Sequence, residues 1–229
     1  MAATVKCDTI VNASSATNNL ALDASGNVTV GAGLTLTGGA LNVGGSVGSA
    51  GQILKSNGTT SSWVNGWTLI NTVTGSGVAA LQDTTSLTST YAQYKILVRN
   101  ILPATNAVTL ALQLYSGGAY KATNYAASYF APGGTATGSN TATFINLSYA
   151  NRASGTYQAA YEFTISNPSS TTVYKPIFAN AVVYDTASIY YTPLLVSGGW
   201  IGGTGAITGF QIYASSGNVA GTVEVWGSN

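Results

Sequence analysis

Residues 108–115 read VTLALQLY, and this stretch decides the fold class. Every second position in it holds a large apolar residue, namely Val108, Leu110, Leu112 and Leu114. The residues between them are Thr109, Ala111, Gln113 and Tyr115. A period of two places alternate side chains on opposite faces of a β-strand, so the stretch predicts a strand with one face in a core.

The same alternation recurs on both sides of this stretch. The apolar positions that it places in the core are Tyr94, Ile96, Val98, Tyr161, Phe163, Ile165, Phe210, Ile212, Val223 and Val225. Further strand-like runs cover 68–73, 143–149, 172–183 and 189–196, and Pro176 and Pro193 assign the last two to edge or bulged strands. No stretch keeps a helical period. About eight or nine strands with Gly, Asn and Pro turns predict an antiparallel, jelly-roll-like β-sandwich.

The composition excludes several classes of function. Only 6% of the 229 residues are charged, against about 25% in an ordinary domain. Seven Lys and Arg against six Asp and Glu cannot neutralise a run of phosphates, so we expect no nucleic-acid partner. The chain has no histidine and one cysteine, which excludes His-dependent triads, His-ligated metals and Cys-rich zinc sites. We therefore expect no metal and no cofactor.

The first residues give no targeting signal. Lys6, Asp8 and Asn12 interrupt the apolar residues of MAATVKCDTIVNASSA, so no signal-peptide core is present. No stretch is continuously apolar over the ~20 residues that a spanning helix needs. We expect a protein that is made in the cytoplasm and does not insert into a membrane.

A composition shift divides the chain near residue 66. No aromatic residue and no proline precedes Trp63, whereas glycine is denser before Gly66 than after it. Residues 57–62, NGTTSS, predict a turn or short linker just before this shift. The shift therefore predicts two parts, an N-terminal region, 1–66, and a C-terminal β-sandwich, 67–229, here called the knob.

The N-terminal part contains short apolar pairs separated by Gly and Asn turns. The pairs are Leu20 with Leu22, Val28 with Val30, Leu34 with Leu36, and Leu41 with Val43. One interpretation is a flexible glycine-rich linker. The other interpretation is a set of very short strands. Such strands bury too few side chains to offset the conformational entropy lost on folding, so they must share a core with other copies of the chain. On the second interpretation these eight residues form a core that several copies share around one axis, here called the stalk core.

Signals for an enzyme are weak. The carboxylates are Asp8, Asp23, Asp83, Glu162, Asp185 and Glu224. A glycosidase needs two of them about 5–10 Å apart, and the sequence leaves the pair Glu162 with Asp185 open. Solvated strand or turn residues are the favoured interpretation. No helix start and no lysine follow residues 202–205, GGTG, which predict a turn and not a phosphate loop, and Cys7 is interpreted as a packing residue. We expect no enzymatic activity.

Aromatic residues suggest where a ligand would bind. Two clusters combine them with small polar residues, one at Tyr115, Tyr120, Tyr125 and Tyr129, the other at Tyr190, Tyr191 and Trp200. Exposed rings stack on the flat faces of sugars and also serve protein recognition. The competing interpretation is that most of these rings are core or sheet-face residues of an all-β domain.

Three segments carry a family resemblance. Residues 19–39, NLALDASGNVTVGAGLTLTGG, resemble the Gly- and Asn-punctuated β-segments of tailed-bacteriophage fibres and trimeric adhesins. Residues 51–58, GQILKSNG, followed by Ser62-Trp63, resemble a junction that recurs before the C-terminal domains of such fibres. Residues 207–227, ITGFQIYASSGNVAGTVEVWG, are similar to the final strands of small sandwich domains in phage virion proteins. Together the three cover under half of the chain.

The resemblance implies a non-enzymatic, homotrimeric fibre or spike of a virion assembled in the host cytoplasm. It implies attachment through residues 1–66 to another virion protein, and contact of the knob with a host cell-surface glycan or protein. The favoured form is a short tail fibre, and the runner-up is a capsid head fibre or decoration protein held by its N-terminus. A carbohydrate-active enzyme and a cellular lectin are weaker alternatives. The absence of a signal peptide favours a phage protein over an exported bacterial adhesin.

Overall fold

The computed structural model describes residues 41–49, 52–56, 59–130, 137–151, 153, 158–184 and 191–228. Fifteen strands and no helix occur in these residues, and all strand pairs are antiparallel. Most of the predicted stalk core lies outside the described residues: Leu20, Leu22, Val28, Val30, Leu34 and Leu36. Leu41 is exposed, and Val43 pairs with Ser46 in an isolated bridge.

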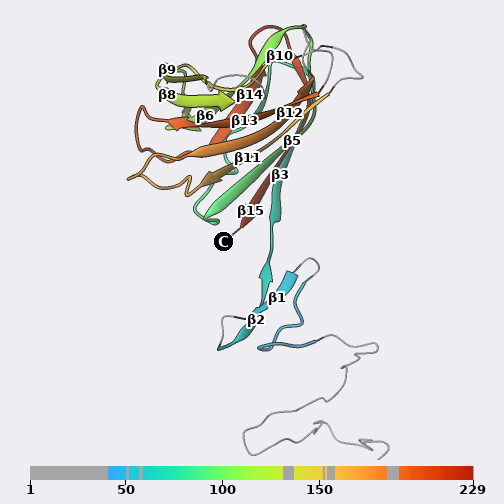
Figure 1. The fold of residues 1–229 in the computed structure, drawn as a ribbon. Coiled ribbons are helices and arrows are strands. Elements are labelled where there is room, and N and C mark those ends of the chain that lie inside the picture. The colour runs from blue at the N-terminus through green and yellow to red at the C-terminus, as the bar shows by residue number, and fades with distance from the viewer. Residues whose placement is uncertain are drawn as a thin grey trace, which may run out of the picture.

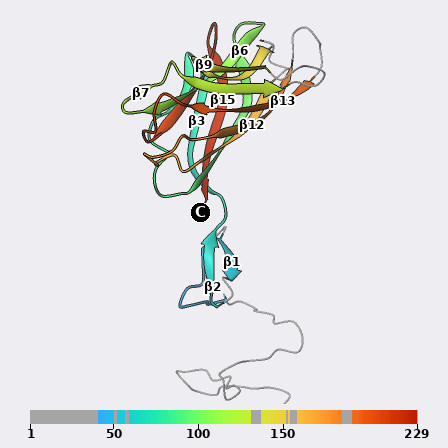
Figure 2. The same cartoon turned by 60° about the vertical axis from the view of Figure 1, so that its left-hand side comes forward.

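The first two strands form a separate hairpin. β1 (Gln52–Ser56) pairs with β2 (Ser61–Asn65), with Gln52 opposite Asn65 and Ser56 opposite Ser61. The predicted turn at 57–62 therefore overlaps the connection between these two strands. The hairpin lies at one end of the larger body, close to the C-terminus (Figures 1 and 2). The predicted boundary between residues 66 and 67 falls between β2 and β3, the first strand of that body.

The body contains two sheets. In spatial order the larger sheet is β3 (Thr68–Val78), β15 (Val219–Ser228), β5 (Gln93–Pro103), β11 (Ala159–Ser166), β12 (Ile177–Tyr184), β13 (Tyr191–Trp200), β8 (Tyr125–Phe130) and β9 (Thr137–Ala142). The smaller sheet is β10 (Ile145–Asn151), β6 (Val108–Ser116), β14 (Gly209–Ala214) and β4 (Ala80–Asp83), and β7 (Ala119–Tyr120) pairs with the end of β6.

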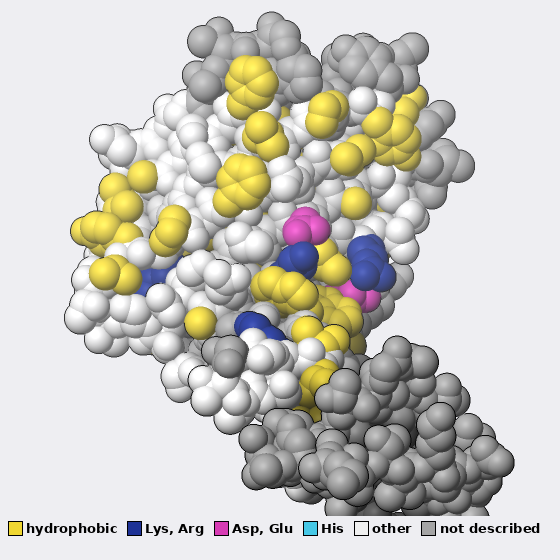
Figure 3. All heavy atoms as spheres, turned by 60° about the horizontal axis from the view of Figure 1, so that its bottom comes forward, with side chains coloured by type: hydrophobic (Ala, Val, Ile, Leu, Met, Phe, Trp, Pro, Cys, Tyr) yellow, Lys and Arg dark blue, Asp and Glu magenta, His cyan; other side chains and the backbone are white. Residues whose placement is uncertain are grey.

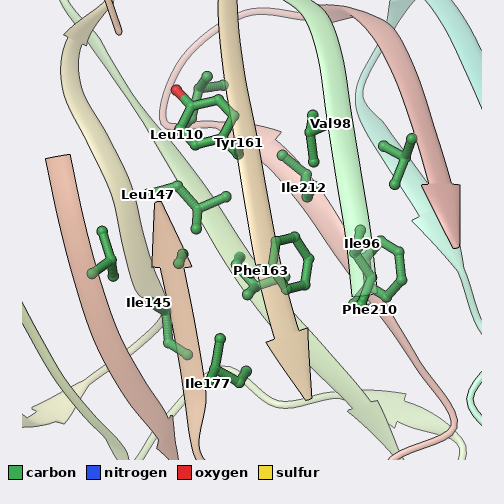
Figure 4. Close-up of a cluster of buried hydrophobic side chains, with 14 of the residues drawn as sticks. Ile96, Val98, Leu110, Ile145, Leu147, Tyr161, Phe163, Ile177, Phe210 and Ile212 are labelled. Carbon is green, nitrogen blue, oxygen red and sulfur yellow. The ribbon is translucent and has the colours of Figure 1, made fainter. Parts of the chain in front are cut away.

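The inner faces of the two sheets share one hydrophobic core. Phe163 from β11 meets Phe210 from β14 edge to face, with 5.7 Å between the ring centroids (Figure 4). The predicted core positions on β5, β6, β11, β14 and β15 are all buried. The all-β, antiparallel fold class is therefore confirmed and is compatible with a sandwich, while the jelly-roll form stays a prediction.

Strand β6 is buried on both faces, which the alternation alone did not predict. Gln113 donates its amide to the Thr143 carbonyl at 2.9 Å and accepts a hydrogen bond from Gln211 at 2.7 Å. Ala111 beside it is fully buried. A buried amide with both of its polar atoms bonded carries little desolvation penalty, so Gln113 can be buried on the second face of β6 beside Ala111.

The two prolines do not mark edge strands, and this part of the prediction is wrong. β12 and β13 are interior strands of the larger sheet. Pro176 precedes the first residue of β12, so it removes no ladder donor. Pro193 lies opposite Val182, whereas β13 pairs with β8 only from Leu195 onward. A proline is tolerated there because its missing N–H faces no second neighbour.

A buried turn closes β4. The Asp83 carboxylate accepts hydrogen bonds from the backbone N–H groups of Thr85 and Ser86 and from the Asn71 side chain, at 2.7 to 3.0 Å. Asp83 is buried, so the interpretation of every acid as a solvated residue is corrected at this position. The turn lies directly against Gly209 of β14, whose missing side chain leaves room for the Asp83 carbonyl.

Candidate functional site

The first predicted aromatic cluster is only partly assembled. Tyr115 and Tyr120 lie on the paired ends of β6 and β7, with 5.0 Å between their ring centroids. Both are half-buried, and burial raises the pKa of Tyr120. Tyr129 is half-buried on β8 and packs against the core. The two paired rings therefore form a small aromatic ridge, from which Tyr129 is separate.

Tyr125 is a core residue, and the expectation of an exposed ring there is corrected. Its side chain is 0% exposed. Its hydroxyl accepts a hydrogen bond from the Leu114 N–H at 2.8 Å and donates one to the Lys121 carbonyl at 3.0 Å. The phenol therefore connects β6 to the segment that precedes β8, and no part of its side chain is exposed to a ligand.

This buried phenol makes stability sensitive to alkaline pH. Burial raises the pKa of Tyr125 well above its usual range, whereas the unfolded phenol titrates near pH ~10. Its stabilising contribution is complete below that pH and declines as the pH rises above it. We expect Tyr125→Phe to lower the free energy of unfolding by about 1–2 kcal/mol at neutral pH. The gap from wild type should narrow above pH ~10, because only the wild type then loses the proton-linked contribution of the Tyr125 phenol.

Guanidinium unfolding at neutral pH and above pH ~10 measures this gap. The control is Tyr174→Phe, because the Tyr174 ring is exposed on a loop. We expect that variant to follow the wild type at both pH values. A gap for Tyr125→Phe that stays constant through the alkaline range would contradict the assignment.

The second predicted cluster divides between two places. Tyr191 is exposed on β13 and meets Tyr184 edge to face at 5.2 Å. Trp200, at the other end of β13, lies opposite Tyr125, and the Lys121 ammonium sits 5.2 Å from its ring centroid. Tyr190 lies outside the described residues. The structure therefore brings the Tyr191 and Trp200 rings to opposite ends of one strand.

The glycine-rich segment 202–205 is a loop, in agreement with the predicted turn. The Lys175 ammonium is buried and donates to the carbonyls of Thr204 and Gly205 at 2.5 and 2.8 Å. Burial lowers the pKa of Lys175. Gly202 and Gly203 lie against the Trp200 ring. The lysine and the ring fix this loop structurally, which accounts for both residues without a ligand.

A larger exposed surface was missed by the sequence reasoning. It is the outer face of β12, β13 and β8, where five apolar side chains are 44–50% exposed: Phe130, Phe178, Val182, Tyr191 and Leu195. Leu195 pairs with Phe130, so the strip is continuous across β13 and β8. In β12, IFANAVVY, apolar residues occur at both the odd-numbered and the even-numbered positions. This pattern indicates a strand with two apolar faces.

The neighbouring strands β15, β5 and β11 carry charge on the same outer face. Lys95 pairs with Glu162 at 3.2 Å, and Arg99 pairs with Glu224 at 2.9 Å. The Lys95 ammonium also lies 5.0 Å from the Trp67 ring centroid. Figure 3 shows basic and acidic side chains side by side, among hydrophobic ones. This face holds half of the charged side chains of the described residues, and they neutralise each other.

A β-bulge opens a hollow in this face. Asn100 has a left-handed backbone with φ 54°, and two β5 residues, Arg99 and Asn100, stand opposite the single residue Ala160 of β11. Beside the bulge is a shallow, open depression of about 300 Å³, here called the sheet-face hollow. Its outward-facing lining consists of the exposed residues Arg99, Ala160, Asn180 and Val182 and the half-buried residues Leu97 and Glu162. Bulges re-aim side chains and recur beside functional sites, so this hollow is the best candidate site.

The described residues hold no group of three His, Cys, Asp or Glu side chains that could bind a metal. In that same part of the chain, no helix has the length and apolarity to cross a membrane. Asp185, the sequence partner considered for Glu162, lies outside it. The expectation that the protein has no enzymatic activity therefore stays a prediction.

Comparisons with protein-family models, with curated proteins and with solved structures find no match for this chain.

Proposed function

We propose that the chain is a structural virion protein of a tailed phage, a homotrimeric short tail fibre or spike. Residues 1–66 attach it to another virion protein and form the stalk, and the jelly-roll-like knob, 67–229, contacts a glycan or protein of the host cell surface. This proposal rests on the family resemblance of the three sequence segments and on one structural observation, the state of the β1–β2 hairpin.

The hairpin exposes apolar side chains on both of its faces. Ile53, 56% exposed, shares one face with its partner Val64, and Leu54, 42% exposed, shares the other with Trp63. On the Trp63 side the indole N–H donates to the Ser46 carbonyl at 3.0 Å, and the ring lies against Gly48. An isolated two-stranded hairpin is marginally stable in water. Copies of the same hairpin around a common axis would cover the remaining apolar surface, which supports self-association, and the family resemblance implies that the number of copies is three.

The exposed strip on β12, β13 and β8 supports the contact role of the knob. Surface apolar side chains are ordinary when scattered, but contiguous ones mark interaction sites. The strip adjoins the ion-paired half of the same face, where the charges cancel. The whole face therefore offers apolar and hydrogen-bonding groups and carries no net charge. Such a surface suits a ligand that carries little charge.

The runner-up function is a head fibre or decoration protein bound to the capsid by residues 1–66. The hairpin supports it equally, because both forms need association through the N-terminal region. A carbohydrate-active enzyme has less support. The outer face of the larger sheet carries two carboxylates in the described residues, Glu162 and Glu224, and each of them is paired with a cation. A cellular lectin is the weakest of the four.

Sedimentation equilibrium of the full chain tests the trimer. We expect a mass three times the 23.2 kDa of one chain, because the hairpin faces need partners. A single species at the chain mass would contradict the proposal. Gold-labelled antibodies against the protein, applied to intact particles, then place it: label on the tail supports the short fibre, and label on the head supports the decoration protein.

A further inference from the structure

We propose that the sheet-face hollow binds an uncharged pyranose ring of a surface glycan. This inference rests on the proposed attachment function and assigns it a place, on β5, β11 and β12. It also moves the site away from the tyrosine clusters that the sequence indicated. The observations that carry it are the shape of the hollow, its order of polar and apolar groups, and its charge balance.

The shape is set by the bulge and by small residues. Ala160 lies opposite Val182 of β12 and faces the widened part of β5, so only a methyl group occupies the floor there. The taller side chains of Arg99, Glu162 and Asn180 stand around it. Small-molecule sites begin at about 300 Å³, which is the size of this hollow. A single sugar ring is a ligand of suitable dimensions.

Side chains that pair across the neighbouring strands β5, β11, β12 and β13 form a row on this face. The two middle residues of the row are polar and the two end residues are apolar. Glu162 pairs with Leu97 on one side and with Asn180 on the other. Asn180 in turn pairs with Leu195. A pyranose has hydroxyls at its edge and C–H groups on its faces. The carboxylate accepts hydrogen bonds from hydroxyls, the amide both donates and accepts, and the flanking leucines contact the C–H groups.

An aromatic ring lies within reach of the same ligand. Phe178 is on the same face of β12 as Asn180, two positions earlier, and half of its side chain is exposed. Two residues along a strand correspond to about 6.6 Å, roughly the span of one sugar ring. A ring bound to Glu162 and Asn180 can therefore place its C–H face or its next residue on Phe178.

The charge balance favours an uncharged sugar over an acidic one. Lys95 and Arg99 each have a carboxylate within 3.2 Å, so the four charged side chains of this face sum to zero. A sialic acid, uronic acid or phosphate would have to displace Glu162 or Glu224 from its cation. A neutral hydroxyl ligand bonds to the outer atoms of the pairs and leaves them intact.

The test uses the full-length protein on an array of oligosaccharides. The array carries neutral hexoses and N-acetylhexosamines beside sialylated, uronic and phosphorylated glycans. We expect binding to at least one neutral saccharide, changing less than about twofold between low salt and about 0.5 M NaCl. Asn180→Ala should weaken binding about tenfold, and Ala160→Phe, which fills the floor, about a hundredfold. Asn140→Ala and Ala119→Phe are matched controls at exposed strand positions outside the hollow and should bind like the wild type.

Three results would overturn the inference: binding to no neutral saccharide, binding to acidic glycans alone, or full binding by both Asn180→Ala and Ala160→Phe. Sedimentation of the same samples separates this inference from the proposed function. A trimer that binds no saccharide leaves the fibre proposal standing and removes the hollow as a site. A monomer whose binding of a neutral saccharide depends on Asn180 and Ala160 keeps the hollow as a site and contradicts the proposed trimeric fibre.

Discussion

Gly209→Ala is expected to destabilise the body by about 3 kcal/mol or more, which lowers its melting temperature by roughly 6–12 °C. A Cβ at this position would lie 2.0 Å from the Asp83 carbonyl oxygen and 2.5 Å from the Thr84 Cα, and both are backbone atoms. The turn cannot simply shift, because the Asp83 carboxylate is bonded to Thr85, Ser86 and Asn71. Strand β14 must therefore move away from β4 or the turn must open.

Thermal unfolding followed by circular dichroism measures this effect. Gly66→Ala is the matched control, since an added Cβ there meets nothing within 4 Å. We expect Gly66→Ala to change the free energy of unfolding by less than about 0.5 kcal/mol. Equal melting temperatures for the two variants would show that the close contact at Gly209 does not hold β14 in place.

Leu54→Asp is expected to convert the proposed trimer to separate chains. In the proposed assembly the Leu54 side chain is covered by a neighbouring copy, and an unpaired carboxylate in that place costs several kcal/mol. Association should weaken about a hundredfold or more. Ile53→Asp, which puts the charge on the opposite hairpin face, should do the same if both faces meet neighbours. Sedimentation equilibrium at a series of protein concentrations reports the change.

The matched control for the hairpin variants is Val173→Asp. Val173 is 52% exposed on the loop that precedes β12 and is not part of the hairpin. It should sediment like the wild type. All three variants should keep the wild-type stability of the body, because each side chain is exposed in the single chain. A Leu54→Asp protein that remains trimeric would place the association elsewhere.

The strands of the body could be predicted because period-two alternation reports one buried face. β11 is the clearest case, with Tyr161, Phe163 and Ile165 buried and the residues between them not. The alternation could not assign β12 its interior place, because pairing partners depend on residues far away in the chain. It also could not foresee the buried second face of β6, which depends on the amide of Gln113 meeting Gln211.

The candidate site could be predicted less well than the fold. Aromatic side chains were chosen by residue type, and type does not report burial: Tyr125 is in the core, whereas Phe178 on an interior strand is half exposed. The sheet-face hollow comes from a single bulge at Asn100. Residues 99, 160 and 180 become neighbours only through pairings between three strands, and no local sequence pattern reports such a meeting.

The position of β15 has a consequence for the order in which the body forms. This strand lies between β3 and β5, and Val223 pairs with both Val73 and Val98. Residues 68–103 thus lack their central neighbour until residues 219–228 have been synthesised, and pairings this distant in sequence form slowly. During synthesis β3 and β5 present open edges, which are templates for wrong pairing. The larger sheet is therefore expected to close only once residues 219–228 are available to pair with both strands.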